Sequence, residues 1–143
     1  MREQQPAPRT PWHLWVVGGL LLVFNGMAAF DYIATVIRYQ PYLSGTPAHI
    51  LEYYFNAPIW MYVMWGVGSF GGLMGSLFLL ARRKIALPIF ILGWICSFVA
   101  MIYTYKNPPP ESGGDISPHI IVLAVMFMVL VYMAWLSRRG TLR

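Results

Sequence analysis

The chain has 143 residues, of which 58% are hydrophobic and 10% are charged. Soluble domains carry about 45–50% apolar and about 25% charged residues, so this composition excludes an ordinary soluble protein and indicates a membrane protein. The formal net charge is +5, but the basic residues form small clusters at the ends of apolar runs. That placement argues against a nucleic-acid-binding face, and we expect no nucleic-acid partner.

The first apolar run extends from about Trp12 to Ile37. Arginines precede it, and Gly26-Met27-Ala28 has the small-x-small pattern of a cleavage site, as in a secretory signal. The run continues well beyond Ala28, however. We therefore expect a retained transmembrane helix over residues 12–37.

Three further apolar runs each exceed the roughly 17 residues that can cross a hydrocarbon core. They cover about residues 57–81, 85–105 and 118–136. Only Arg82-Arg83-Lys84 separates the second run from the third, so these two helices must be antiparallel neighbours.

The two remaining connections differ in character. In the longer one, Ala48 to Phe55 has aromatic residues on one side, which predicts a short interfacial helix. The other contains Pro108-Pro109-Pro110 and Gly113-Gly114, which predicts an extended loop. Residues 1–143 are therefore predicted to form one domain, an all-α membrane protein with a four-transmembrane-helix bundle.

The distribution of Lys and Arg predicts the orientation in the membrane. The two chain ends and the 82–84 connection hold eight of the ten basic residues, namely Arg2, Arg9, Arg82, Arg83, Lys84, Arg138, Arg139 and Arg143. The opposite side holds Arg38 and Lys106, together with the acidic residues Glu52, Glu111 and Asp115. We expect a multi-pass protein of a bacterial inner membrane with both termini in the cytoplasm.

Three polar residues in or beside the first span are candidates for function. An ionised Asp31 within a bilayer is costly unless it is paired, hydrated or protonated. Asp31 is either a proton- or cation-coupling carboxylate or a structural anchor bonded to Arg38, a tyrosine or loop backbone. Asn25 lies deeper, where an amide usually bonds to another helix and less often contacts a substrate. Because Asn25 and Asp31 lie on different faces, this helix predicts contacts with two neighbours or with another subunit.

The second span carries two overlapping ridges of small residues, formed by Gly68, Gly71, Gly72, Gly75 and Ser76. Small residues spaced four apart let another helix backbone approach closely, which favours association in lipid. Two ridges are more than one partner needs. We expect one ridge to pack inside the chain and the other to contact a partner.

Metal and cofactor sites are not expected. His13 is predicted at the cytoplasmic side, whereas His49 and His119 are predicted at the opposite side, where Glu52 follows His49 by one helical turn. These last three form a possible polar cluster that is either solvated or able to bind a divalent ion. Cys96 is the single cysteine, so no intrachain disulfide is possible.

Several motifs together carry a family resemblance. They are Trp12-His13-Leu14-Trp15, Phe24-Asn25-Gly26, Phe30-Asp31-Tyr32, Gly71-Gly72-x-x-Gly75-Ser76 before Arg82-Arg83, and the terminal Arg138-Arg139-Gly140. Over most of its length the chain resembles small four-helix inner-membrane proteins of α-proteobacteria that are commonly labelled "sugar transporter". The resemblance implies four spans and brings no functional residues with it.

The sequence favours a non-enzymatic protein that acts by binding other transmembrane helices. It would be an accessory subunit of a larger inner-membrane complex, or a homo-oligomer. The alternative is a small dimeric transporter, coupled to protons or cations, in which Asp31 and Asn25 line a solute path. Besides the lipid bilayer, the expected partners are therefore transmembrane helices.

Overall fold

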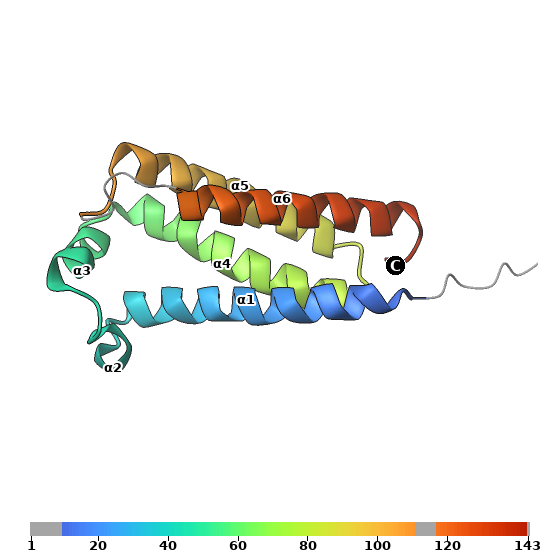
Figure 1. Ribbon diagram of the computed structural model, residues 1–143, viewed down its shortest axis with the longest axis horizontal. Coiled ribbons are helices and arrows are strands. Elements are labelled where there is room, and N and C mark those ends of the chain that lie inside the picture. The colour runs from blue at the N-terminus through green and yellow to red at the C-terminus, as the bar shows by residue number, and fades with distance from the viewer. Residues whose placement is uncertain (1–9, 111–116, 143) are drawn as a thin grey trace, which may run out of the picture.

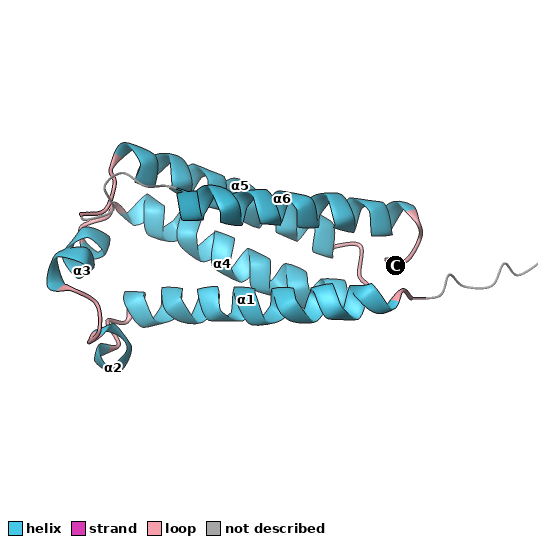
Figure 2. Ribbon diagram, viewed as in Figure 1, coloured by secondary structure: helices cyan, strands magenta, loops and turns pink. Residues whose placement is uncertain are grey.

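The computed structural model describes residues 10–110 and 117–142, which form helices joined by short connections (Figures 1 and 2). In chain order they are α1 (Trp12–Val36), α2 (Gln40–Leu43), α3 (Ala48–Phe55), α4 (Ile59–Leu80), α5 (Ala86–Lys106) and α6 (Ser117–Arg138). No strand occurs in the two described segments, and the predicted all-α class is confirmed.

Four helices are long and apolar enough to cross a bilayer, namely α1, α4, α5 and most of α6. Their ends agree with the predicted spans to within two residues, and the chain is a multi-pass membrane protein. The short helix expected at residues 48–55 is α3, whereas the single turn α2 was not foreseen. The orientation stays a prediction, and five of the charged residues on which it depends lie outside the described residues: Arg2, Arg9, Glu111, Asp115 and Arg143.

Three of the spanning helices end in the same hydrogen-bonded motif. After α1, the amide of Arg38 donates to the Thr35 carbonyl (3.1 Å) and the amide of Tyr39 donates to the Ala34 carbonyl (2.8 Å). Arg38 has φ 54°, so the pattern is a Schellman motif with arginine in the left-handed position usually taken by glycine. The same pair of bonds follows α4 around Arg82 (φ 56°) and α6 around Gly140 (φ 70°).

The spanning helices form a row in which α1 packs on α4, α4 on α5, and α5 on α6. The contacts of α4 with α1 and with α5 are the most extensive. The start of α1 and the end of α6 lie at one end of the bundle, beside the α4–α5 connection (Figure 1). We call this the turn end. The opposite end, which carries α2 and α3, is the loop end.

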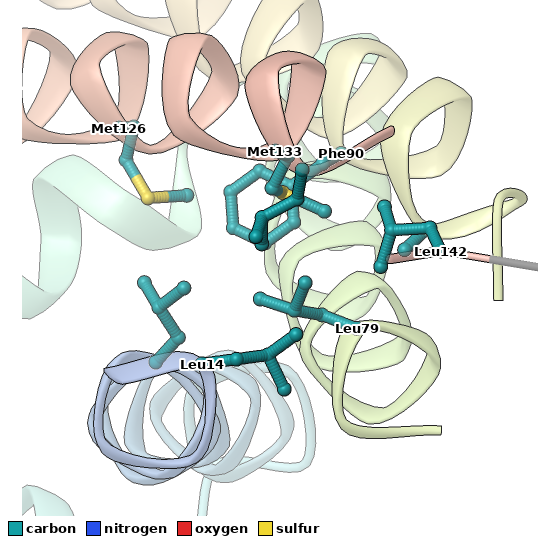
Figure 3. Packing of buried hydrophobic residues seen from close by; sticks show 9 residues of the cluster. Leu14, Leu79, Phe90, Met126, Met133 and Leu142 are labelled. Carbon is teal, nitrogen blue, oxygen red and sulfur yellow. The ribbon is translucent and has the colours of Figure 1, made fainter. Parts of the chain in front are cut away.

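The hydrophobic core is concentrated at the turn end. Leu14 from α1, Leu79 from α4 and Phe90 from α5 are fully buried and point toward Met133 of α6 (Figure 3). The chain that follows α6 turns back at Gly140 and places Leu142 in the same cluster. All four spanning helices are therefore tied together at this end.

Candidate binding cleft between α1 and α6

The small residues of α4 allow α5 to approach it closely. A Cβ atom added at Gly71 would lie 3.2 Å from the Cα of Gly93, and one added at Gly68 would lie 2.7 Å from the Ser97 hydroxyl. Nearer the turn end, a Cβ at Gly75 would lie 2.5 Å from the Phe90 ring. This ridge is therefore occupied by α5.

In the ridge predicted from Gly68, Gly72 and Ser76, the last two residues pack against α1, whereas Gly68 faces α5. Gly72 lies against the side-chain amide of Asn25, and a Cβ at Gly66 would lie 2.9 Å from the Tyr32 hydroxyl. We call the two glycine-lined contacts of α4, with α5 and with α1, the α4 seam. The expectation that one ridge is left for an external partner is wrong, because both ridges pack against helices of the same chain.

Asn25 joins α1 to α4 within the seam. Its side-chain nitrogen donates to the Leu21 carbonyl at 2.8 Å and to the Ser76 hydroxyl at 3.1 Å, and Asn25 is 2% exposed. Ser76 in turn donates to the Gly72 carbonyl at 2.7 Å. These bonds satisfy polar groups that would otherwise be costly inside a bilayer.

Within the described residues, α1 and α6 are not packed together in this way on the loop-end side. An open cleft of about 380 Å³ lies there, with walls from α1 and α6 and a floor from α4 and α5. Phe24 of α1 and Val122 of α6 line it while remaining 48% and 41% exposed, so its rim faces the surrounding lipid. Tyr53 and Tyr54 of α3 contribute to its lining from the loop end.

The lining of the cleft is mainly apolar and aromatic, with few polar groups. The aromatic side chains are Phe24, Tyr53, Tyr54, Trp65 and Trp94, and the polar ones include Asn25, Asp31, Ser69, Ser97, Thr104 and His119. Small-molecule sites in proteins combine a concave apolar surface of about 300–1,000 Å³ with a few placed polar groups. The size and chemistry of the cleft match that description.

The cleft ends where α1 and α6 meet at the turn end. There Nδ1 of His13 is hydrogen-bonded to the Tyr132 hydroxyl, and the His13 ring also packs edge-on against that tyrosine. Met133 and Leu136 of α6 are fully buried in the adjacent core. The cleft is thus closed toward the turn end and does not continue through the bundle.

Asp31 lies at the edge of the cleft and is tied to α2. Its Oδ1 accepts a hydrogen bond of 3.0 Å from the Tyr42 hydroxyl, and the Tyr42 ring packs edge-on against Phe30 at 5.2 Å. Donation to the carboxylate raises the pKa of Tyr42 above its ordinary value. Asp31 is thus anchored to a tyrosine of the following loop, as one alternative expected, and it also faces the cleft.

Arg38 does not fold back onto Asp31. Its guanidinium lies over the Phe55 ring, 4.4 Å from the ring centroid, and it lines a separate hollow between α1 and α4. The two-sided polarity of α1 is explained within the chain, because Asn25 faces α4 whereas Asp31 faces the cleft and α2.

Hydrogen bonds hold α3 across the loop end. The Tyr53 hydroxyl donates to the Asn107 carbonyl at 2.7 Å, and the Tyr62 hydroxyl donates to the Tyr54 carbonyl at 2.6 Å. Burial, and secondarily the charge of Asp31, raise the pKa of Tyr54 above its ordinary value. The rings of Tyr54 and Trp65 lie 5.9 Å apart, which extends the aromatic lining from α3 into α4.

The three residues predicted as a polar cluster are not all placed in one site. His119 lines the cleft, whereas His49 and Glu52 are exposed residues of α3 outside its lining. Within residues 10–110 and 117–142, no group of three or more His, Cys, Asp or Glu side chains has the geometry to hold a metal ion.

The aromatic lining of the cleft was not predicted from the sequence, and neither were Gly93 and Ser97, the small residues of α5 that pack against α4. Trp94 lies in the middle of α5, although tryptophan in membrane proteins is enriched at the two interfaces. Its indole nitrogen donates to the Leu123 carbonyl of α6 at 3.1 Å. The unusual depth of Trp94 could be recognised from the sequence, but its hydrogen-bond partner on α6 could not.

The chain matches no known protein-family model, no curated protein and no solved structure. The resemblance to four-helix inner-membrane proteins therefore stays a prediction, and the cleft itself carries the argument about function.

Proposed function

We propose that this protein binds a small amphipathic molecule from the surrounding bilayer, as the solute-binding unit of a small membrane transporter. The observation that carries the proposal is the laterally open cleft of about 380 Å³ between α1 and α6. In this proposal, the cleft binds the molecule and does not catalyse a reaction on it.

The lining suits a ligand that is part apolar and part polar. Phe24, Val122 and Met126 offer apolar surface near the lipid-facing rim, while Asn25 and Ser69 place polar groups at the floor. An apolar molecule dissolved in lipid gains little from burial alone, because the lipid tails are equally apolar. The polar groups must therefore supply much of the preference of the cleft for its ligand.

The closed turn end supports a transport cycle in which the cleft opens on one side at a time. In the conformation described, His13 and Tyr132 join α1 to α6 at the turn end, while the cleft opens laterally between the same two helices. Asp31 and Asn25 both line the cleft, as the transport alternative requires. In this proposal, the positive-inside rule puts the loop end, near which the cleft lies, on the non-cytoplasmic side.

The test is photolabelling with a diazirine analogue of a long-chain alcohol, which is an uncharged amphipathic probe. We expect labelled peptides from α1 and α6 at the cleft, and we expect Ala28→Trp to remove most of that labelling, because Ala28 lines the cleft. The matched control is Ala124→Trp, at an exposed position of α6, which should label as the wild type does. Labelling spread evenly over lipid-facing residues, and equal in both variants, would reject the proposal.

A second candidate function is association with a transmembrane helix of another protein, as an accessory subunit. The observation that favours it is the open row of helices, in which α1 and α6 flank a gap on the loop-end side. The small residues of α4 no longer support it, because the chain uses them internally. Native mass spectrometry of protein isolated in mild detergent separates the two candidates, since it distinguishes a bound small molecule from a stoichiometric foreign subunit.

A further inference from the structure

The ionisable groups in the cleft suggest which class of molecule it selects. Apart from tyrosines, the ionisable residues in its described lining are Asp31 of α1 and His119 of α6. Asp31 is the acidic side chain of this lining, and no lysine or arginine is among the described residues that line the cleft. The carboxyl group of Asp31 is therefore the feature of this mainly apolar and aromatic lining that distinguishes a cation from an anion.

The surroundings of Asp31 leave it able to accept a cation. Its Oδ1 accepts a hydrogen bond from the Tyr42 hydroxyl, and the nearest arginine in sequence, Arg38, lies over the Phe55 ring instead. A carboxylate has two oxygens and about four lone-pair sites, so one hydrogen bond leaves most of its accepting capacity unused. A carboxylate near the bilayer interior is costly without a counter-charge, and a bound cation supplies one.

The aromatic side chains strengthen the same preference. Tyr54, Trp65 and Trp94 line the cleft together with Asp31, and Trp94 stacks on Phe98 with 5.6 Å between ring centroids. The faces of aromatic rings attract cations and repel anions, most strongly where water is excluded. The carboxylate and the aromatic rings thus both favour a positively charged ligand over a negatively charged one.

We propose that the cleft selects a lipophilic monocation, whose positive group lies near Asp31 and whose apolar part occupies the space between α1 and α6. This inference rests on the proposed binding function and adds the charge of the ligand to it. Neutral amphipathic molecules of similar shape bind more weakly, and anions bind least. The lipid-facing rim at Phe24 and Val122 gives such a molecule a route of entry from the membrane.

The experiment compares two probes of nearly the same shape and opposite charge, tetraphenylphosphonium and tetraphenylborate. Each competes with the uncharged diazirine alcohol for labelling of the cleft in protein held in a nonionic detergent. We expect tetraphenylphosphonium to reduce labelling at a concentration about tenfold lower than tetraphenylborate requires. Equal potency, or greater potency of the borate, would overturn the inference.

Substitution of the carboxylate tests its role directly. Asp31→Asn should weaken tetraphenylphosphonium about tenfold and leave tetraphenylborate unchanged or slightly stronger. Asp31→Glu keeps the charge and should restore most of the preference for the cation. A preference for the cation that persists in Asp31→Asn would assign the selectivity to the aromatic rings and overturn the role of the carboxylate.

The outcomes separate this inference from the function on which it rests. If the uncharged probe labels the cleft and both ions compete equally, the binding function stands and the charge preference is wrong. If the uncharged probe never labels the cleft, the binding function itself fails. If Asp31→Asn does not fold, the comparison of the two ions on the wild-type protein still decides the charge preference.

Discussion

The α4 seam and the gap between α1 and α6 show two ways of joining helices in one small bundle. In the seam, glycines bring α4 against α5 so closely that a Cβ at Gly71 would lie 3.2 Å from the Cα of Gly93. Across the gap, the described residues of α1 and α6 meet near the turn end and leave a cleft of about 380 Å³ toward the loop end. The closely packed part of the molecule is thus central, and the open part is lateral.

The difference follows from the residues on each surface. Lipid tails are as apolar as leucine, so helices associate in a bilayer through close packing and polar contacts between them, not through the hydrophobic effect. The α4 seam has both, in its glycines and in the Asn25–Ser76 bond. The cleft is instead lined by large side chains such as Phe24 of α1 and Trp94 of α5.

The largest expected effect comes from breaking the seam at Gly93. A Cβ there would lie 3.3 Å from the Gly68 carbonyl oxygen and 3.4 Å from the Gly72 amide nitrogen, and these backbone atoms cannot move aside easily. Gly93→Leu should reduce the free energy of unfolding in mixed micelles by about 3 kcal/mol or more. Gly19→Leu is the matched control, because a Cβ at Gly19 meets nothing within 4 Å. Similar stability of the two variants would mean that α4 and α5 do not pack as described.

The second prediction concerns the place where the gap is closed. Met133 of α6 is fully buried at the turn end, in the cluster that also contains Leu14 and Phe90. Met133→Ala should reduce the free energy of unfolding by about 2 kcal/mol, because it removes buried contacts and leaves a cavity. Met128→Ala, at a position 62% exposed on the same helix, should change it far less. If both substitutions had the same effect, the turn end would not be the site that ties α6 to the bundle.

The positions of the spans were predictable because they depend on local pattern. Apolar runs of sufficient length predict the four spanning helices, and Arg82-Arg83-Lys84 leaves too few residues for anything but a tight turn. The helix at residues 48–55 was recognisable from its aromatic side. The single turn α2 was not, since four residues are too few for a periodic signal.

The contacts between the helices were less predictable. Glycine spacing shows that α4 has two surfaces for close packing, but it does not say which helices occupy them, and α1 and α5 occupy both. Asp31 and Asn25 were recognised as unusual residues within a span, whereas most of the aromatic lining of the cleft comes from α3, α4 and α5. A cleft is a property of how helices diverge, and no single segment of sequence contains that information.

The third prediction measures the polar contribution to the seam. The Asn25 side-chain nitrogen donates to the Ser76 hydroxyl at 3.1 Å between two spanning helices. A double-mutant cycle of Asn25→Ala and Ser76→Ala should give a coupling of about 0.6–1 kcal/mol, as interhelical hydrogen bonds in membrane proteins usually do. Asn25→Ala with Thr104→Ala is the control pair, because Thr104 bonds within its own helix to the Ala100 carbonyl. A coupling near zero for Asn25 and Ser76 would leave glycine packing as the whole basis of the seam.

The smallest expected effect lies at the loop end, where Tyr54 of α3 lines the cleft. Burial, and then the charge of Asp31, raise its pKa above the ordinary value of 10.0. A raised pKa in the folded state means that folding favours the protonated phenol. Tyr54 therefore contributes stability that is fully present below about pH 10 and is lost as the pH rises through its folded-state pKa.

Midpoints of unfolding measured from about pH 9 to about pH 11 should consequently fall with rising pH in the wild type. They should fall less steeply in Tyr54→Phe, which has no phenolic proton to lose. Tyr39→Phe, at a position 46% exposed and outside the cleft lining, should retain the wild-type slope. If Tyr54→Phe kept that slope as well, α3 would be too loosely held to shape the cleft, and the loop end would be more open than the bonds of Tyr53 and Tyr62 indicate.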